Sequence, residues 1–551
     1  MRWLLYSLLA LPVLASAQPD VLPAEHSVYG FLRDARAAGV LPEYRHEVLP
    51  LSRGEVLRML DSLAMRRERL AEGSRQWMAA YRRELDPTAE QVHSWIGDGG
   101  ATLTDLDAER YLAYSESADG VIRVSARAGL QLRQSDGPNT LGDPLPSAGG
   151  AALVPELTMS AHWRDWLGAT SSTYNGLQVT GDTRVLRADP EIASLYYVGI
   201  GDGPPAGSYD RSTAALRVEG GPFAAEIANA RLRMGPSPAT PLLLSDGADY
   251  FPYVRASFSK GLVRYQILHG ALSDRTTYVR EPDNEGIRGP ERYLALHRLE
   301  AFTSIANVAF SEMVVYGLRG PELAYLNPLY PIKPAEHALW DRDNSLFALD
   351  ATVRPLRGVE LAGTFLADDL NFERIGEREG NNNKWAAQAS ASLGLIPGAT
   401  VYGEYTRIEP YVYTHRFQSE GSFYNSYTHN GLGLGHPLGP NADQWLVGAR
   451  TWLPLGLQLE ARARYVRRGE NPVDPETGAT IPVGGDVRDG TQADPLIKEF
   501  LAGDVYRGPG ASFDLTWEPV NSLLARLQVD WQQWDLGADR LFIRLDASVQ
   551  L

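Results

Sequence analysis

The chain has 551 residues, no cysteine and a formal net charge of −16. The absence of cysteine excludes disulfides, thiol chemistry and cysteine-ligated zinc or iron–sulfur sites, and it fits an exported protein. The acidic balance argues against a nucleic-acid partner, because phosphate binding requires a basic surface.

The first 17 residues have the layout of a secretory signal peptide. Met1 and Arg2 precede an apolar run from Leu4 to Leu14, and Ala15-Ser-Ala17 supplies a small-x-small cleavage site. The apolar run is too short to span a bilayer as a helix. We therefore expect residues 1–17 to be removed and the mature chain to start near Gln18.

Residues 18–100 are predicted to form a small helical bundle followed by a linker. Apolar residues recur at helical spacing at Val28, Phe31, Leu32 and Ala35. Ser52 and Glu55 have the spacing of a capping box, in which each side chain accepts a hydrogen bond from the backbone of the other residue. A third helix is expected to hold Trp77, Ala80 and Tyr81, and the glycine-rich stretch 97–101 ends the region.

Residues 101–551 are predicted to form a transmembrane β-barrel. Apolar and polar residues alternate in segments of strand length, as in Ile122 to Leu132 and in Leu541 to Leu551. In the last third of the chain we expect nine strands, at 345–354, 358–369, 384–394, 399–409, 444–453, 457–467, 511–518, 522–533 and 541–551. Short proline-containing turns alternate strictly with long connections between them, which is typical of outer-membrane barrels and not of sandwiches. The spacing and the even-strand rule predict 16 to 20 strands, with the long connections outside the cell.

The alternation also assigns the two faces of each strand. In the strand at 522–533 the residues expected to face lipid are Leu523, Ala525, Leu527, Val529 and Trp531. Those expected to face the lumen are Arg526, Gln528, Asp530 and Gln532. Mixed charges on the lumenal face indicate a structural ladder of ion pairs in preference to an ion-selectivity device.

The connection 410–443 is the strongest candidate for a ligand-binding loop. Aromatic rings cover the apolar faces of sugars, while amides and imidazoles hydrogen-bond to hydroxyl groups. The candidate polysaccharide-binding residues are Tyr411, Tyr413, Tyr424, Asn425, Tyr427, His429 and Asn430. The alternative is a folded-in loop whose tyrosines form a small core of their own, or an extension of the aromatic girdle.

Catalytic and metal-binding motifs are poorly represented, and we expect no enzyme activity, no cofactor and no metal. His415 with Ser419, and His429 with Asn430, supply the residue types of a phospholipase without its motif. The run from Asp341 to Ser345 offers oxygen ligands for calcium, but it lacks the glycine and distal glutamate of an EF-hand. A turn cap before the strand at 345–354 is the preferred interpretation of that run.

Several short motifs together resemble the Wzi-type capsule-assembly family of outer-membrane proteins. In the helical region they are His26-Ser-Val-Tyr29, Gly39-Val-Leu41 and Pro50-Leu-Ser-Arg-Gly-Glu55. In the barrel they are Gly235-Pro236, Leu242-Leu-Leu-Ser245, His297-Arg-Leu299, Ser311-Glu312, Tyr325-Leu-Asn-Pro328, Asp343-Asn344, Tyr427-Thr-His-Asn-Gly431 and Leu434-Gly-His-Pro-Leu-Gly-Pro440. The resemblance spans nearly all of the mature chain.

The resemblance implies a barrel of about 18 strands with a periplasmic or plugging helical bundle. It also implies a lectin-like function, in which the protein holds capsular or extracellular polysaccharide at the cell surface. The expected partners are that polysaccharide and outer-membrane lipid, and we expect a monomer. The opening region is also similar to a surface-layer-homology module, and the alternative function is therefore a porin tethered to the cell wall.

Overall fold

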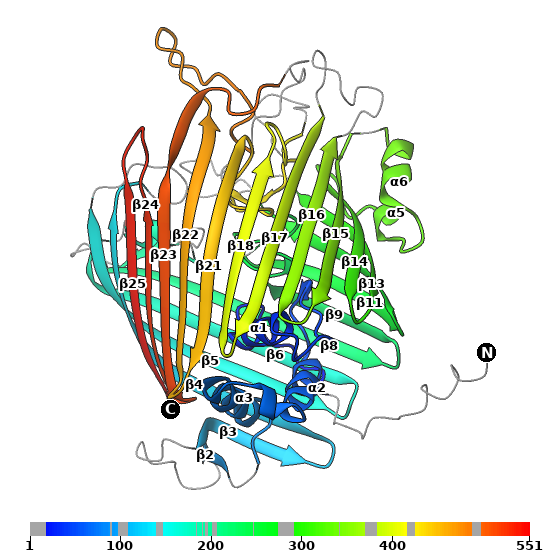
Figure 1. Cartoon of the computed structure of the whole chain (residues 1–551), viewed down its shortest axis with the longest axis vertical. Helices are drawn as coiled ribbons and strands as arrows, with labels where there is room; N and C mark the ends of the chain where they lie inside the picture. The colour runs from blue at the N-terminus through cyan, green and yellow to red at the C-terminus, as the bar shows by residue number, and fades with distance from the viewer. Residues whose placement is uncertain are drawn as a thin grey trace.

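A computed structural model of the chain shows a closed β-barrel with helices at one end (Figure 1). The structure describes residues 18–88, 91–96, 108–138, 147–182, 185–189, 191–192, 197–200, 206–245, 247–273, 291–340, 342–369, 383–415, 425–487 and 498–551. The predicted signal peptide, residues 1–17, lies outside the described residues.

The barrel wall has 18 antiparallel strands, as the resemblance implied. Its first nine strands are β4 (Gly120–Asp136), β5 (Ala148–Trp163), β6 (Leu167–Gly181), β8 (Ala206–Gly220), β9 (Phe223–Ala230), β11 (Phe251–Lys260), β12 (Val263–Leu272), β13 (Arg292–Phe302) and β14 (Ala306–Gly317). The other nine are β15 (Asn344–Leu356), β16 (Val359–Asp369), β17 (Lys384–Ile396), β18 (Ala399–Ile408), β21 (Ala442–Leu453), β22 (Leu457–Glu470), β23 (Asp504–Val520), β24 (Leu523–Gln532) and β25 (Arg540–Gln550). The last strand pairs with the first, which closes the sheet and leaves the wall without an edge.

All nine strands predicted for the last third of the chain are present. Strand β24 shows the expected separation of apolar residues on one face from polar residues on the other. On β24, Leu527 lies between Leu515 and Leu545 of the neighbouring strands, so three leucines share one row of the outer face. On the opposite face, Arg526 pairs with the Asp514 carboxylate at 3.2 Å. The predicted lipid and lumen faces of β24 are therefore confirmed.

Short turns lie at one end of the barrel and long connections at the other. Gly358 and Gly456 have positive φ in two of the short turns, a backbone conformation that glycine adopts without steric cost. Two long strands exceed their predicted lengths: β22 continues to Glu470 and β23 begins at Asp504. Their apolar alternation fades before their backbone pairing ends, so the connection predicted at 468–510 is shorter than expected.

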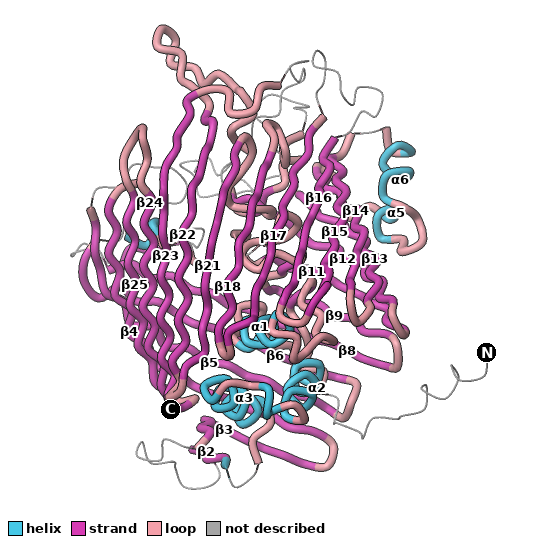
Figure 2. Tube along the Cα trace, in the orientation of Figure 1, coloured by secondary structure: helices cyan, strands magenta, loops and turns pink. Residues whose placement is uncertain are grey.

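Helices α1 (Val28–Ala37), α2 (Arg53–Ala64) and α3 (Glu72–Leu85) cover the short-turn end (Figure 2). The predicted capping box is present: the Ser52 hydroxyl accepts from the Glu55 backbone N–H at 3.4 Å, and the Glu55 carboxylate accepts from the Ser52 N–H at 3.0 Å. Trp452 on β21 joins the core of the three helices. Gly73 lies against the backbone of Trp452, where a Cβ atom would approach the carbonyl oxygen to 2.3 Å.

The remaining elements are short. They are β1 (Val48–Leu49), the 3-10 turn Arg67–Arg69, β2 (Val92–Ile96), β3 (Glu109–Ser117), α4 (Val185–Ala188), β7 (Tyr197–Ile200), β10 (Arg233–Met234), α5 (Leu323–Leu326), α6 (Ile332–Ala338), β19 (Thr428–His429) and β20 (Leu432–Gly433). Strand β3 pairs with the start of β4, and β2 adds to it in parallel at the short-turn end. The barrel wall itself begins at Gly120.

Candidate functional site: the lumen and the long-loop mouth

The tyrosines predicted to bind sugar are buried inside the barrel. Tyr413 is 1% exposed and Tyr427 is 0% exposed, and their rings stack with centroids 5.5 Å apart. The Tyr413 hydroxyl donates to the Leu242 carbonyl at 2.7 Å, and the Tyr427 hydroxyl donates to the Leu243 carbonyl at 2.6 Å. Both rings belong to an apolar core that also includes side chains of β14 and β15. Their predicted role as an external stacking surface is therefore wrong, and the folded-in alternative holds for them.

The other candidate residues of this connection are also engaged within the protein. Tyr411 is buried, and its hydroxyl donates to the Pro482 carbonyl at 3.0 Å. Buried Asn425 donates its amide to the Arg342 carbonyl at 2.7 Å. The His429 ring lies 3.1 Å from the Tyr250 carbonyl. Tyr424 lies outside the described residues, as does Ser419.

Asn430 joins the candidate connection to two other segments. Its amide donates to the Asp249 carboxylate at 3.0 Å, and its carbonyl accepts from the Ser273 hydroxyl at 2.5 Å. The backbone N–H of Ser273 also donates to the His429 ring at 3.1 Å. Because these amide and imidazole groups hold loops together, the sequence-predicted residues form a structural network. The residue types of this connection predict a sugar-binding surface, but they carry no signal for the direction in which the connection folds.

Asp343 and Asn344, from the run considered for calcium, have structural partners. The Asp343 carboxylate accepts from Arg319 at 3.0 Å and from the Tyr325 hydroxyl at 2.7 Å. The Asn344 amide donates to the Asn425 carbonyl at 2.9 Å. Asp341 lies outside the described residues. Within the described part of the chain, no group of three or more His, Asp or Glu side chains could hold a metal ion.

The N-terminal segment enters the barrel from the short-turn end. Arg36 on α1 is 1% exposed and donates to both carboxylate oxygens of Glu360 on β16, at 2.8 and 2.9 Å. It also donates to Glu47 at 2.9 Å. Burial by itself raises the pKa of the Glu47 carboxyl, but the Arg36 charge more than reverses this, so its pKa is lowered and Glu47 stays ionised.

A two-stranded ribbon joins this segment to a connection that folds inward from the other end. In the ribbon, β1 pairs antiparallel with β10, and the Gly235 N–H donates to the Glu47 carbonyl at 2.9 Å. Further along, the Ser237 hydroxyl donates to Glu404 on β18 at 2.6 Å. The β10 connection then reaches Leu242 and the stacked tyrosines. Segments from both ends of the barrel therefore meet and interlock in the lumen.

A third insertion brings acidic groups to the opposite wall. Asp189 follows α4 and accepts from Arg133 on β4 at 2.6 Å. Glu191 lies 2.8 Å from Arg544 on β25. Lumenal side chains of the other wall are buried by the inserted segments, as shown by Arg298, Ser311, Asp350, Thr364 and Thr406. The mixed lumenal charges thus form structural ion pairs, as predicted.

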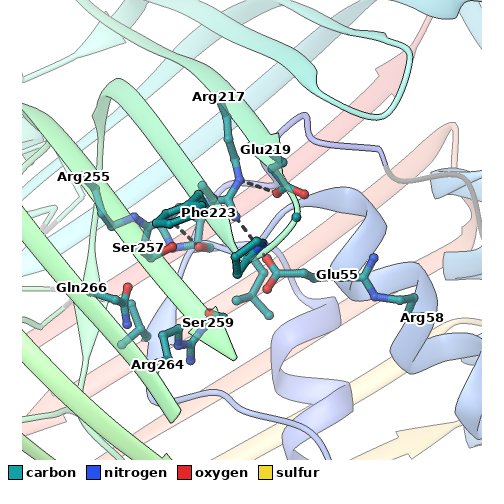
Figure 3. Close-up of a pocket in the computed structure, with 16 residues that line it drawn as sticks. Glu55, Arg58, Arg217, Glu219, Phe223, Arg255, Ser257, Ser259, Arg264 and Gln266 are labelled. Carbon is teal, nitrogen blue, oxygen red and sulfur yellow. Dashed lines mark hydrogen bonds and ion pairs between the residues drawn. The ribbon is translucent and has the colours of Figure 1, made fainter. Parts of the chain in front are cut away.

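A polar cavity of about 170 Å³ lies between α2 and the short-turn ends of β8, β9, β11 and β12 (Figure 3). Glu226 accepts from Arg217 at 3.0 Å and from Arg255 at 2.9 Å. Burial raises the pKa of Glu55 on α2, but Arg217 and Arg264 outweigh this and lower it to about 2. Because carboxylates pair with Arg217 and Arg255, we interpret the cavity as part of the seal between helix and wall.

Two aromatic side chains are accessible at the long-loop mouth, one on the inner face of β23 and one just after β24. Arg468 lies opposite Tyr506 in the register, on the same face of the sheet as the lumenal Arg464. Half-buried Tyr506 and Trp534 meet edge to face, with ring centroids 6.2 Å apart. Glu470 lies 3.5 Å from Arg468. We define Arg468, Glu470, Tyr506 and Trp534 as the inner lip.

The inner lip combines aromatic rings with hydrogen-bonding groups, the combination predicted for the 410–443 connection. Aromatic rings beside charged groups can contact both the apolar faces and the hydroxyl groups of a sugar. Sequence reasoning missed Tyr506 because it assigned this residue to a loop, and Trp534 because it opens a different connection. Only continued pairing of β22 with β23 beyond the apolar alternation brings the residues together.

The closed 18-strand wall defines this protein as a β-barrel of the outer-membrane type. Among the described residues, no helix is long and apolar enough to cross a membrane. Wzi of Escherichia coli, an outer-membrane protein involved in group 1 capsule assembly and described as a carbohydrate-binding β-barrel, has a similar structure. The TM-score is 0.57 at 13% identity, over 96% of this chain and 99% of Wzi. The predicted resemblance to Wzi is therefore confirmed at the level of the fold.

Two other solved structures have lower TM-scores. OccK9 of Pseudomonas aeruginosa has a TM-score of 0.43 at 14% identity, over 78% of this chain and 98% of that protein. OccAB4 of Acinetobacter baumannii has a TM-score of 0.43 at 12% identity, over 79% of this chain and 99% of that protein. Neither a protein-family model nor a curated protein sequence matches this chain.

Proposed function

We propose that this protein holds polysaccharide at the outer surface of the outer membrane, on the inner lip. In bacterial barrels the short turns face the periplasm and the long connections face outside. That rule orients helices α1 to α3 toward the periplasm and Tyr506 and Trp534 toward the cell exterior. Similarity to a barrel described as carbohydrate-binding supports the ligand class.

The observation that carries the proposal is the interlocked lumen with aromatic side chains at its outer rim. The ribbon of β1 and β10 ties the two inserted segments together, and buried ion pairs fasten them to the wall. At the mouth, continued pairing of β22 with β23 holds Arg468, Glu470 and Tyr506 in fixed relative positions. A fixed surface suits retention of a polymer, because ordering of loops on binding would cost free energy.

The lip offers specific roles for its side chains in holding a sugar. Tyr506 and Trp534 provide ring faces against which the C–H faces of a pyranose can pack. Arg468 and Glu470 provide a donor and an acceptor for hydroxyl groups, and Arg468 can also contact a carboxylate of an acidic sugar. Many repeat units along one polymer would multiply a weak single-site affinity through avidity.

The test replaces Tyr506 and Trp534 with alanine in cells that carry a surface polymer. Each lost stacking contact should remove about 1 kcal/mol, or about fivefold in affinity for a short fragment. We expect the double variant to release polymer into the medium while its amount in the membrane and its heat-modifiable migration on gels stay normal.

The matched control is Trp445→Ala, which removes a tryptophan that is 60% exposed on the outer face of β21. Unchanged retention in the lip double variant would eliminate the lip as the binding site. If deletion of the whole gene also left retention unchanged and lowered small-solute uptake, the tethered-porin alternative would replace this proposal.

A further inference from the structure

One long connection folds outward and covers the lipid-facing wall. We call residues 318–340, between β14 and β15, the outer strap; it contains α5 and α6, which lie outside the barrel in Figure 1. On the outer face of β14, Val308 and Phe310 are 48% and 47% exposed, as expected for side chains in contact with lipid. Val314 and Tyr316 continue the same face but are 0% exposed, because the strap lies on them.

The strap is fastened to the wall by apolar packing and by hydrogen bonds. Ile332 and Ala335 of α6 pack into a cluster with Val314 and Tyr316. The Glu322 backbone N–H donates to the Tyr316 hydroxyl at 2.8 Å. Lower on the wall, the hydroxyl of Tyr265 on β12 donates to the Pro328 carbonyl at 2.6 Å.

These two hydrogen bonds show how far down the wall the strap extends. Tyr265 lies in the same row of the sheet as Leu299 and Phe310. On β14 the segment from Tyr316 to Phe310 covers roughly 20 Å at about 3.4 Å per residue. The side chain of Tyr265 spans part of that distance. The strap therefore descends along a face that carries exposed apolar side chains.

Beneath and beside the strap the wall carries polar groups that lipid would not solvate. The ring of half-buried His269 lies 2.7 Å from the Tyr316 hydroxyl, and the strap packs on Tyr316. His297 lies 3.4 Å from Glu312 and is 4% exposed, with the Tyr265 ring 6.1 Å away. Polar and ionisable groups facing hydrocarbon cost free energy unless they are paired or covered.

The opposite surface of the strap is mainly apolar, although Asn327 and His337 are also exposed there. Leu323 is 78% exposed, Leu329 is 88% exposed and Trp340 is 90% exposed. Charged side chains of the strap have ion-pair partners, as in Lys333 with Glu336 at 2.7 Å. An apolar surface that continues the exposed wall, with a tryptophan at its end, matches the edge of a bilayer.

We propose that the outer strap docks on the lipid bilayer, with Leu323, Leu329 and Trp340 in the acyl-chain boundary of the outward leaflet. The strap thereby covers a polar stretch of the wall and presents an apolar surface to the lipid. Its helices have four and seven residues, and helix ends lack intrahelical partners for their terminal N–H and C=O groups, so we place the strap at the interface and not in the centre of the hydrocarbon. This assignment does not depend on polysaccharide binding.

The cysteine-free chain permits a direct test with single-cysteine variants. Leu329→Cys and Trp340→Cys are each labelled with an environment-sensitive fluorophore and reconstituted in phosphatidylcholine vesicles with brominated acyl chains. Phe310→Cys, on the exposed wall, is the lipid control, and Val473→Cys, 60% exposed in the connection between β22 and β23, is the water control. Heat-modifiable migration on gels confirms that each labelled barrel is folded. Because two strap positions are labelled, the test remains possible if one of the two variants does not fold.

We expect a blue-shifted emission at both strap positions and quenching at least half as strong as at Phe310→Cys. Emission and quenching like those of Val473→Cys would overturn the proposal, because they would place the strap in water. Efficient cross-linking of Leu329→Cys between two barrels, together with loss of lipid quenching, would also overturn it and assign the surface to a second copy of the chain.

Discussion

Replacement of Arg36 by methionine should release helix α1 from the barrel. The guanidinium is buried and donates to Glu360, to Glu47 and, at 2.9 Å, to the Tyr44 carbonyl. Methionine fills much of the same volume but leaves two carboxylates without their cation. Removal of one partner from a buried ion pair typically costs about 3–5 kcal/mol, because the remaining charge stays desolvated.

An exposed arginine in the same region provides the matched control. Arg66 pairs with Glu43 at 2.8 Å, but both side chains are about one-third exposed. Solvent screens such a pair, so Arg66→Met should cost about 0–1 kcal/mol. The two substitutions remove the same chemical group, but the two arginines differ in burial and in the number of carboxylate partners, two for Arg36 and one for Arg66.

The assay is hydrogen–deuterium exchange of the α1 amides in the folded, detergent-solubilised barrel. A loss of about 3–5 kcal/mol corresponds to a fall in protection of at least a hundredfold, at about 1.4 kcal/mol per tenfold change. Adding Glu360→Gln to Arg36→Met should restore part of the protection, because it removes one unpaired charge. Equal losses in Arg36→Met and Arg66→Met would refute the argument that this buried pair anchors the helix.

Two further predictions test the membrane faces and the helical bundle. Leu527→Arg on the lipid face should destabilise the barrel by about 2–4 kcal/mol if it lies near the bilayer midplane, whereas Gln528→Arg on the lumenal face should have a far smaller effect. Chemical unfolding in vesicles measures both free energies. The reverse order would show that the assigned register is wrong by one residue. Burial lowers the pKa of His26, but Glu84 at 3.0 Å outweighs this and raises it, while the pKa of Glu84 is lowered. The His26 contribution to stability is therefore complete below its unfolded pKa of 6.5 and is lost as the pH rises through the higher folded value. Exchange of the α3 amides should accelerate over that interval beyond the intrinsic effect of pH, and His26→Gln should remove the extra dependence; an unchanged profile in the variant would contradict it.

The amino-acid sequence by itself determined the wall of the barrel. A strand sends alternate side chains to opposite faces, so the apolar set from Leu523 to Trp531 along β24 identifies the face expected to meet lipid. The alternation of short and long connections separated the two ends of the barrel. The capping box of Ser52 and Glu55 located the start of α2, because that signal depends only on neighbouring residues.

Only the tertiary structure decided where the long connections go. The composition of 410–443 fits an exposed lectin loop and a buried core equally well, and contacts with Leu242 and Leu243, far away in the sequence, draw Tyr413 and Tyr427 inward. Another connection folds outward as the strap, where Trp340 faces away from the wall. These choices depend on long-range packing and on the closed sheet, so local periodicity carries no signal for them.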